Sequence, residues 1–386
     1  MNDPLTRWLL EEGCTHKSMG DLVEAFCAAL HKAGVPVDRI FLGTVIPHPQ
    51  AAGVAVIYEA LKDERRDIEI DHQRFTFMQA QTSTPIRYLL TRAIELRARL
   101  CQGEVRGMDD LRELKADGYT DFIGFPLTFM GQTAGGVTFC SQRPEGFTEA
   151  QISALQSAIP ALSAVAYLVI QRLVQRTLLC AYLGKDAGSR VHRGQVHRGQ
   201  GATVRAAILF ADMRGFTKLS SEQPRDAVLE ILNAVFEVTV GAIQEQGGQV
   251  LKFMGDGLLA TFSSPLDENA CAAAERAAIA AQTALSKLGE TRTTESKITP
   301  GLGVGLHLGD VVYGNIGAPG RLDFTVIGAA VNLAARIESV CGKLDEKILM
   351  SPDFVDALNQ PRRSCGEFDL KGVPHPVTIF APEICD

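Results

Sequence analysis

The sequence lacks the cysteine patterns that mark disulfide frameworks and metal sites. Its nine cysteines are scattered, with no CxxC pair and no metal-ligand spacing. An odd number of scattered cysteines in a chain of this length predicts reduced, mostly buried thiols, so we expect a cytoplasmic protein. The N-terminus also lacks a basic segment followed by a long apolar run, and we therefore expect no signal peptide.

Long hydrophobic runs are missing too. The most apolar stretch, residues 161–174, is interrupted by Ser163, Gln171 and Arg172. A membrane-spanning helix needs about 20 predominantly apolar residues. This stretch is therefore expected to be too short and too polar to span a bilayer.

An excess of positive charge is absent. The net charge is -7 at pH 7, which argues against bulk attraction to nucleic acid or anionic membranes. A local cationic pocket for a phosphate ligand remains open. Apolar residues make up 46% and charged residues 22%, which excludes a disordered chain, a collagen and a coiled-coil rod. With 386 residues, the chain is long enough for about two or three domains.

The first part of the chain predicts a mixed α/β domain. Its apolar spacing predicts helices over 21–32, 85–100 and 108–116, and strands over 39–45, 54–58, 121–129 and 135–140. Ser83 or Thr84 is a candidate N-cap for the second helix. This order of elements resembles the GAF family of small-molecule sensor domains, over about residues 18–175. We assign residues 1–147 to this GAF-like sensor domain.

The GAF resemblance implies a small-molecule ligand but does not identify it. A cyclic nucleotide, another small metabolite, haem or a redox signal all remain open. Haem needs an axial ligand, for which His31, His48 and His72 are available, although each is expected to be a surface or loop histidine. Cys101 and Cys140 lack the local context of a chromophore attachment site.

A long helix is expected from about Thr148 to Leu183. Apolar residues repeat along it at intervals of four and three: Leu155, Ile159, Leu162, Ala166, Val169, Leu173, Cys180 and Leu183. Arg176 interrupts this seam, and Pro160 should kink or restart the helix. Two interpretations are open: a terminal helix that packs on its own domain, or a parallel dimer helix that carries a signal onward.

The next segment, residues 184–201, contains VHRGQ twice and predicts a linker or a short β-turn element. His192 and His197 lack a third metal ligand nearby, which disfavours a metal site. We assign residues 148–202 to the signalling helix and linker.

The second half begins with RAAILFADMRGFT, residues 205–217, an apolar strand that ends at Asp212. Gly215, Phe216 and Thr217 then offer backbone N–H groups, before an amphipathic helix over about 226–244. A glycine turn that opens onto a helix is a natural phosphate cradle. Many strands end in aspartate, so this signal alone is weak.

Residues 248–262, GQVLKFMGDGLLATF, predict two strands joined by a tight turn with Asp256 at its tip. The turn alone would explain the Gly-Asp-Gly sequence. If Asp256 lies beside Asp212, however, the two carboxylates would repel unless a divalent cation lies between them. Mg²⁺ is commonly held by one or two carboxylates together with substrate phosphates. Lys252 lies on the strand that enters the turn.

Residues 324–338, FTVIGAAVNLAARIE, predict a strand that ends at Ile327, a turn at Gly328 and a helix. Asn332 and Arg336 lie four residues apart on one face of that helix. Each has an ordinary structural explanation, but together, beside a glycine turn, they indicate a site.

Four segments together resemble the class III adenylate/guanylate cyclase catalytic domain, over about residues 203–383, and we assign residues 203–386 to this domain. FADMRGFT, LKFMGDGLLATF, GLHLGDVVYGNIG and DFTVIGAAVNLAARIE occur in the order and approximate spacing of that family. The resemblance implies a ferredoxin-like α/β domain with a βαββαβ-type sheet and helices on one side. The expected fold class of the whole chain is therefore α/β (α+β), with the GAF-like domain, a connecting helix and the cyclase domain in that order.

The resemblance also implies roles for single residues. Asp212 and Asp256 would hold two Mg²⁺ or Mn²⁺ ions, and Lys252 and Thr325 would contact the purine. Asn332 would orient the ribose, and Arg336 would stabilise charge on the phosphate in the transition state. Lys371, in FDLKGVPHPV, would contact the triphosphate, and Lys347 falls where some members have an arginine near the phosphates.

In that family the active sites lie between the protomers of a head-to-tail dimer, so the resemblance implies a homodimer. It implies that ATP is converted to 3′,5′-cyclic AMP and pyrophosphate, under control of the N-terminal domain. Lysine at position 252 and threonine at position 325 favour adenine, because members that prefer GTP typically carry an acidic residue where Lys252 stands. A guanylate cyclase, or a catalytically silent nucleotide-binding module, remains the alternative.

Overall fold

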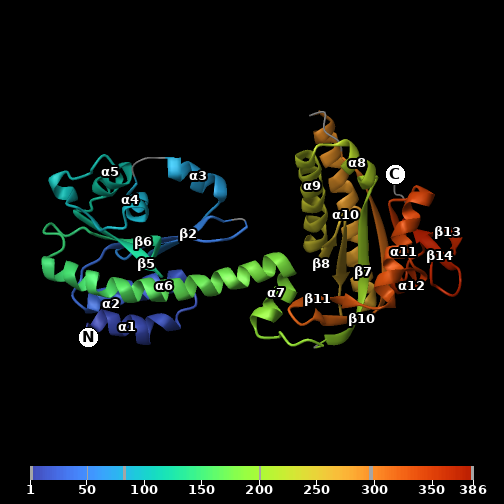
Figure 1. Cartoon of the computed structure of the whole chain (residues 1–386), viewed down its shortest axis with the longest axis horizontal. Helices are drawn as coiled ribbons and strands as arrows, with labels where there is room; N and C mark the ends of the chain where they lie inside the picture. The colour runs from blue at the N-terminus through green and yellow to red at the C-terminus, as the bar shows by residue number, and fades with distance from the viewer. Residues whose placement is uncertain (1–2, 50, 81–83, 200, 295–298, 384–386) are drawn as a thin grey trace. The chain divides into compact units, whose positions relative to one another are not determined.

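Figure 1 shows the computed structural model of the chain, which describes residues 3–49, 51–80, 84–199, 201–294 and 299–383. The chain divides between Leu178 and Leu179 into two compact units. Each unit has its own β-sheet and its own hydrophobic core. The expected mixed α/β class is confirmed.

The N-terminal unit is built on a six-stranded antiparallel sheet in the order β3-β2-β1-β6-β5-β4. Its strands are β1 (Arg39–Val45), β2 (Gly53–Glu59), β3 (Glu64–Ile70), β4 (Leu96–Ala98), β5 (Asp121–Phe129) and β6 (Gln132–Ser141). Its helices are α1 (Pro4–Glu11), α2 (Met19–Lys32), α3 (His72–Ala80), α4 (Pro85–Arg92), α5 (Asp109–Ala116) and α6 (Glu149–Leu183), with 3₁₀ turns at Gly13–Thr15 and Leu100–Gln102.

Helices cover both faces of this sheet. Residues of α1, α2 and α6 form the larger apolar cluster against β1, β2, β5 and β6. Residues of α4 and α5 form a second cluster with β4 and β5. The GAF-like identity of this unit stays a prediction, carried by the order of its elements.

The helix expected over residues 85–100 is half as long as predicted. Thr84 caps α4, because its Oγ1 accepts the Arg87 N–H at 3.3 Å, while Ser83 lies outside the described residues. Ala93 ends the helix in the left-handed conformation, at φ 53°. Leu96 and Ala98 are then buried in a short strand that pairs with β5. Helical periodicity alone could not show this switch, because the apolar residues fit both patterns over so short a stretch.

The long helix α6 packs on its own unit. Leu155, Leu162, Ala166 and Val169 of the predicted seam are buried in the N-terminal core, whereas the side chain of Leu173 is 47% exposed. This arrangement matches the interpretation of a terminal helix for most of its length. The helix continues through Pro160 without ending.

By length and composition, α6 is the single helix in the described residues that could cross a membrane, and half of its most apolar stretch is buried. The sequence expectation considered only residues 161–174, a shorter segment than the 35-residue helix that forms. The burial of α6 against the core of its own unit is typical of a core helix of a folded domain.

The predicted linker contains a helix, α7 (Lys185–His192). An i, i+4 contact stabilises it, in which Arg190 Nε donates to Asp186 Oδ2 at 2.7 Å. A Cβ on Gly188 would collide with the backbone at Cys180, so glycine is what lets α7 lie against the last turns of α6. The prediction of a linker misses this helix, whereas the residues that follow it, 193–199, lie in turns and irregular structure.

The C-terminal unit contains an eight-stranded sheet in the order β13-β14-β12-β10-β7-β9-β8, with β11 paired to β10. Only β10 and β12 pair in parallel among the described strands. The strands are β7 (Gly201–Arg214), β8 (Gln249–Met254), β9 (Gly257–Phe262), β10 (Gly301–Ala318), β11 (Arg321–Ile327), β12 (Ile348–Met350), β13 (Arg363–Phe368) and β14 (Val377–Ala381). The helices are α8 (Phe216–Glu222), α9 (Arg225–Glu245), α10 (Asp267–Thr294), α11 (Ala329–Leu344) and α12 (Pro352–Leu358).

The alternation of β10 separates the two faces of this sheet. Its leucines and valine at even positions, from Leu302 to Leu308, pack with α9, α10 and α12. Gly305, at an odd position, faces α11, and a Cβ there would collide with the Ala334 carbonyl. Helices therefore lie on both faces, not on one as the resemblance implied. Because Asp212 on β7 pairs with Gly303 on β10, Asp212 lies on the face that α11 covers.

Candidate active site

The two predicted metal ligands, Asp212 and Asp256, lie close together at one end of β7. Asp212 pairs with Gly257 on β9, and the Met213 N–H donates to the Asp256 carbonyl at 3.3 Å. A Cβ on Gly257 would lie 2.6 Å from Asp212 Oδ1, so the glycine leaves room for that carboxylate. Burial and the neighbouring Asp256 raise the pKa of Asp212 to about 6. The pair is thus an electrostatically strained acidic site.

A third carboxyl group lies beside this pair, and the sequence did not predict it. Glu338 on α11 covers Gly303, where a Cβ would collide with Glu338 Oε1. Burial, then Asp212, raises the pKa of Glu338 to about 7, although Arg214 opposes the shift. The only sequence signal was its place two residues after Arg336, on the opposite side of the helix.

The two aspartates suit a divalent cation whose coordination shell is completed by a bound substrate. Within the described residues, no three His, Cys, Asp or Glu side chains form a ready metal cage. Asp212 and Asp256 supply carboxylate oxygens, which Mg²⁺ and Mn²⁺ prefer, and their mutual repulsion is relieved by a cation. Remaining ligands would come from phosphate and water. The two aspartates therefore fit the metal ions that the sequence resemblance implies.

The expected phosphate cradle follows directly after β7. Gly215 adopts φ 72° and turns the chain into α8, whose first residues are Phe216 and Thr217. The first N–H groups of a helix have no hydrogen-bond partner within the helix. In the described structure no side chain caps the start of α8, so no capping side chain satisfies these groups either. Lys347 is exposed directly before β12, and its carbonyl accepts the Val304 N–H at 2.9 Å.

A cationic group forms around α11. A Cβ on Gly372 would lie 3.5 Å from Arg336 Nη2, so the guanidinium lies beside the turn that carries Lys371. Asn332 is exposed one helical turn earlier. In the part of the chain that the structure describes, no hydrogen bond or ion pair joins Asn332 or Arg336 to Asp212 or Asp256. One chain therefore carries an acidic group and a cationic group with no direct polar contact between them.

The two candidate purine contacts lie on β8 and β11. Lys252 is half-buried, and Thr325 is 5% exposed. The Thr325 hydroxyl has no hydrogen-bond partner in the structure, which is unfavourable for a buried polar group unless a ligand supplies one. Four candidate cations form no ion pair with a described acidic residue: Lys252, Arg336, Lys347 and Lys371.

Contacts from α7 reach the strand beside Thr325. The Tyr313 hydroxyl donates to Asp186 Oδ2 at 2.9 Å, and the Arg190 guanidinium lies 5.4 Å from the Tyr313 ring centroid. Burial, then the Asp186 contact, raises the pKa of Tyr313. Tyr313 precedes Gly314, which pairs with Thr325. The segment that precedes the cyclase sheet is thus bonded to the residue next to a candidate substrate-binding position.

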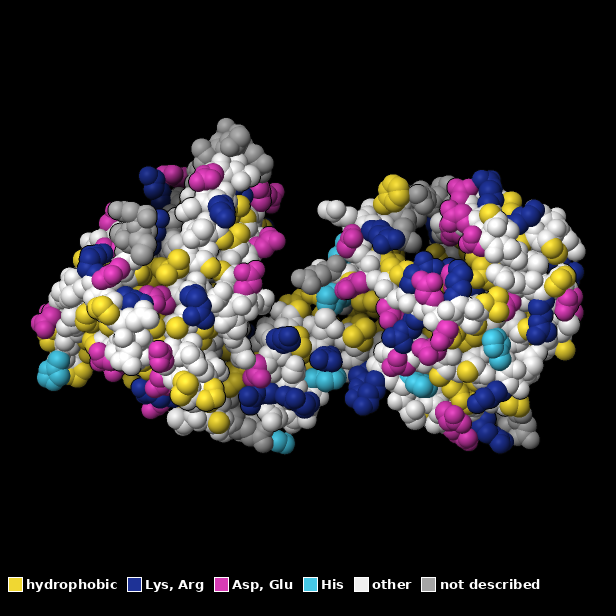
Figure 2. Space-filling model, turned by 180° about the vertical axis from the view of Figure 1, so that it is seen from behind, with side chains coloured by type: hydrophobic (Ala, Val, Ile, Leu, Met, Phe, Trp, Pro, Cys, Tyr) yellow, Lys and Arg dark blue, Asp and Glu magenta, His cyan; other side chains and the backbone are white. Residues whose placement is uncertain are grey.

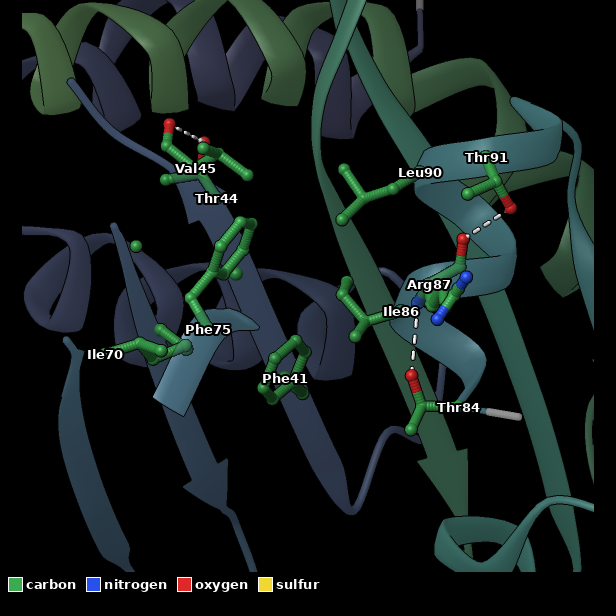
Figure 3. Close-up of a pocket in the computed structure, with 13 residues that line it drawn as sticks. Phe41, Thr44, Val45, Ile70, Phe75, Thr84, Ile86, Arg87, Leu90 and Thr91 are labelled. Carbon is green, nitrogen blue, oxygen red and sulfur yellow. Dashed lines mark hydrogen bonds between the residues drawn. The ribbon is translucent and has the colours of Figure 1, made fainter. Parts of the chain in front are cut away.

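The N-terminal unit contains a cavity of about 260 Å³ between β1, β2 and helices α3 and α4. Figure 3 shows the rings of Phe41 and Phe75 facing Ile86 and Leu90 across it. Arg87 and three threonines, Thr44, Thr84 and Thr91, also line it, and each threonine hydroxyl bonds to a backbone group. This is a mainly apolar site of the size of a small ligand.

None of the histidines considered for haem lines this cavity, although His48 lines a second cavity of about 520 Å³ in the same unit. His31 Nε2 lies 2.6 Å from the Val37 carbonyl, and His72 Nε2 lies 2.9 Å from the His48 carbonyl. Cys101 is exposed and Cys140 is buried, and neither lines the cavity. The cavity therefore favours a small molecule held mainly by apolar contacts, with Arg87 as the charged residue of the described lining.

Charge on the surface is mixed. On the face in Figure 2, Asp and Glu side chains are interspersed with Lys and Arg side chains. The absence of a nucleic-acid partner stays a prediction from the net charge.

Comparison with known proteins identifies the C-terminal unit. Residues 200–381 match the family model for the adenylate and guanylate cyclase catalytic domain. An adenylate cyclase of Anabaena cylindrica is 36% identical over 167 residues, which are 42% of this chain and 32% of that protein. An uncharacterized protein of Mycobacterium tuberculosis is 31% identical over 211 residues, which are 54% of this chain and 36% of that protein. The chain thus spans about a third of these curated relatives.

Solved structures of cyclases are similar to about half of this chain. The adenylyl cyclase CyaB from P. aeruginosa is 28% identical, with 47% of this chain and 94% of that chain covered and a TM-score of 0.44. The guanylyl cyclase Cya2 is 32% identical, with 47% and 92% covered and a TM-score of 0.42. From the family match, together with the motifs placed above, residues 200–381 form a catalytic domain of the adenylate and guanylate cyclase family.

Proposed function

We propose that this protein is a cytoplasmic adenylate cyclase that converts ATP to 3′,5′-cyclic AMP and pyrophosphate in a homodimer. The observation that carries the proposal is the pairing of Asp212 with Asp256 inside a cyclase catalytic domain. Two like charges brought together beside a phosphate-cradling turn suit a divalent cation and a nucleotide triphosphate.

The chemistry assigns a task to each group. Asp212 and Asp256 would hold two Mg²⁺ or Mn²⁺ ions, which, when bound, supply Lewis acidity at the 3′-hydroxyl and at the phosphoryl oxygens. The turn at Gly215, Phe216 and Thr217 binds phosphate through its N–H groups. Lys347 and Lys371 add positive charge along the triphosphate.

Arg336 offsets the charge that develops on the α-phosphoryl group, and Asn332 orients the ribose. The bond between the 3′-oxygen and the α-phosphorus forms as the bond from that phosphorus to the pyrophosphate oxygen breaks. The 3′-hydroxyl proton leaves to solvent. No protein nucleophile is needed. We place Arg336 and Asn332 across a dimer interface from the aspartates, since no polar contact joins the two groups within one chain.

Adenine is the proposed base. The Lys252 ammonium can donate to adenine N1, and the unpartnered Thr325 hydroxyl can accept from the N6 amine. Guanine would present the O6 acceptor and the N1–H donor at these positions. Thr325 remains a weaker discriminator than Lys252, because its hydroxyl can also donate.

The N-terminal unit is proposed to regulate the reaction through a small molecule bound in its cavity. The cavity's apolar lining, with Arg87 among its residues, favours a compact, mainly apolar ligand with one or two polar groups. A ligand of this kind changes activity only if it binds two arrangements of the protein with different affinity.

The test is an assay of the purified full-length protein with ATP and, separately, with GTP in Mn²⁺. A kcat/KM for forming cyclic AMP from ATP that is at least about ten times the kcat/KM for forming cyclic GMP from GTP supports the proposal. The reverse preference makes it a guanylate cyclase. Nucleotide binding without either cyclic product makes it a silent signalling module.

A further inference from the structure

Glu338 is the acidic residue that the proposed mechanism does not use. It lies on α11, and its Oε1 occupies the space where a Cβ of Gly303 would lie. Gly303 pairs with Asp212 across the β7–β10 ladder. The carboxyl group of Glu338 therefore lies directly over the residue beside Asp212.

The charges around Glu338 belong to the acidic pair and to one cation. Asp212 and Asp256 both disfavour its ionised form, while Arg214 favours it. Arg214 is itself held just beyond the C-terminal end of α11, because it donates to the Glu346 carbonyl and its Nη1 lies 3.5 Å from Asp345 Oδ1. Three carboxyl groups and one guanidinium thus share a partly buried region.

The backbone forces this juxtaposition. A Cβ on Gly305 would lie 2.6 Å from the Glu338 N, and one on Gly309 would lie 2.7 Å from the Ala330 Cβ. The glycines of β10 let α11 approach the sheet closely enough for Glu338 to reach Gly303. On a helix, Glu338 lies about 200° around from Arg336. One side of α11 therefore faces its own chain's aspartates, and the other carries Asn332 and Arg336.

We propose that Glu338 is a positioning residue of the metal site, whose carboxylate raises the affinity of the Asp212–Asp256 pair for divalent cations. This proposal rests on the proposed function. In this proposal Glu338 acts through Asp212, because its carboxyl group lies over Gly303, the residue that pairs with Asp212. Its negative charge stabilises a bound cation and is itself stabilised by that cation.

A residue with this role affects metal affinity more than the rate of the chemical step. Loss of the charge should raise the Mn²⁺ concentration needed for activity, whereas kcat at saturating Mn²⁺ should change little. A residue that only supports the fold would instead lower stability and leave the metal requirement as it is.

The experiment measures Mn²⁺ binding directly, by the loss of the free-ion EPR signal, in the full-length protein with α,β-methylene-ATP. Glu338→Gln keeps the shape and removes the charge. We expect its Kd for Mn²⁺ to rise about tenfold. Glu367→Gln is the matched control, because Glu367 is exposed on β13. It should bind Mn²⁺ as the unaltered protein does. In turnover assays, the Mn²⁺ requirement of Glu338→Gln should rise by the same factor.

Unchanged or tighter Mn²⁺ binding by folded Glu338→Gln overturns the proposal. If that variant fails to fold by circular dichroism, Glu338→Asp decides, since it keeps the charge and must bind Mn²⁺ within about threefold of the unaltered protein. Failure of the proposed function looks different: the unaltered protein would bind Mn²⁺ but form no cyclic nucleotide. If the unaltered protein forms cyclic AMP but Glu338→Gln binds Mn²⁺ with an unchanged Kd, the role of Glu338 is wrong and the proposed function stands.

Discussion

The two units of this chain hold their candidate sites in contrasting ways. The N-terminal unit has a mainly apolar cavity formed by Phe41, Phe75 and α4. The C-terminal unit has carboxylates and cations at strand ends, turns and one helix face. An apolar cavity can be lined by many combinations of side chains, so its sequence carries no motif. Metal-assisted phosphoryl chemistry needs particular side chains at fixed spacing, so its sequence does.

This contrast explains what could be predicted. The hairpin with Asp256 at its tip and the strand that ends near Asp212 follow from local patterns, and the structure places both aspartates together. The paired strands β1–β2 and β5–β6 followed from local patterns as well. Each of these features depends on residues close together in the sequence.

Features that depend on distant residues were missed. Glu338 reaches Asp212 only through the register of β7 with β10 and the close approach of α11 to Gly303 and Gly305. Helix α7 was missed because Gly188 looked like a linker residue until Cys180 was placed against it. The sensor cavity joins strands and a helix that are up to about 50 residues apart along the chain, which no periodicity records.

The largest expected effect tests whether catalysis requires the acidic pair. Asp256→Ala should reduce cyclic AMP formation by more than about 100-fold, because metal ions supply several kcal/mol of transition-state stabilisation. The measurement is the initial rate in saturating Mn²⁺. Asp356→Ala, on the exposed side of α12, is the control and should keep full activity. Substantial turnover by Asp256→Ala would remove this residue from the site.

The second prediction concerns the separation of the acidic and cationic groups. Asp212→Ala and Arg336→Ala should each be nearly inactive, because each variant spoils both sites of a homodimer. After subunit exchange, half of the dimers are mixed and have one intact site, so activity should return to about a quarter of that of the unaltered protein. Exchange is verified by tagged subunits. A mixture no more active than its parts would place both groups in one chain's site.

The third prediction uses the raised pKa of Asp212, and it separates the two units in one experiment. The folded state holds the carboxyl proton up to a pKa of about 6, whereas the unfolded chain releases it near 3.8. The associated stability is therefore fully present below about pH 4 and is lost as pH rises through about 6. Asp212→Asn stays neutral and avoids this loss. In metal-free protein at pH 7.5, it should be more stable than the unaltered protein, by on the order of 1–2 kcal/mol.

Calorimetry at pH 5 and 7.5 measures this difference. The sole tryptophan, Trp8, lies in the N-terminal unit, so its fluorescence transition is an internal control that should not move. Saturating Mn²⁺ should reverse the order, because it binds only the unaltered protein's aspartate pair. A gain in stability that is the same at both pH values would show that burial of the charge is not its cause.

The smallest expected effect concerns α6, where the two units join. Most of the apolar seam is buried in the N-terminal core up to Val169, so only its part from Leu173 onward is free to pair with a second chain. Arg176 is exposed just beyond that point and places a charge where such a pair would form. Arg176→Leu should therefore tighten the dimer, by about three- to tenfold in Kd, and shift the basal rate by a smaller factor.

Analytical ultracentrifugation measures the dimer Kd, and the cyclase assay without added ligand measures the basal rate. Gln175→Leu, at the neighbouring exposed position, is the control. If neither dimer affinity nor basal rate responds to Arg176→Leu, α6 is a tether, and the contacts of α7 with Tyr313 become the route to examine for communication between sensor and active site.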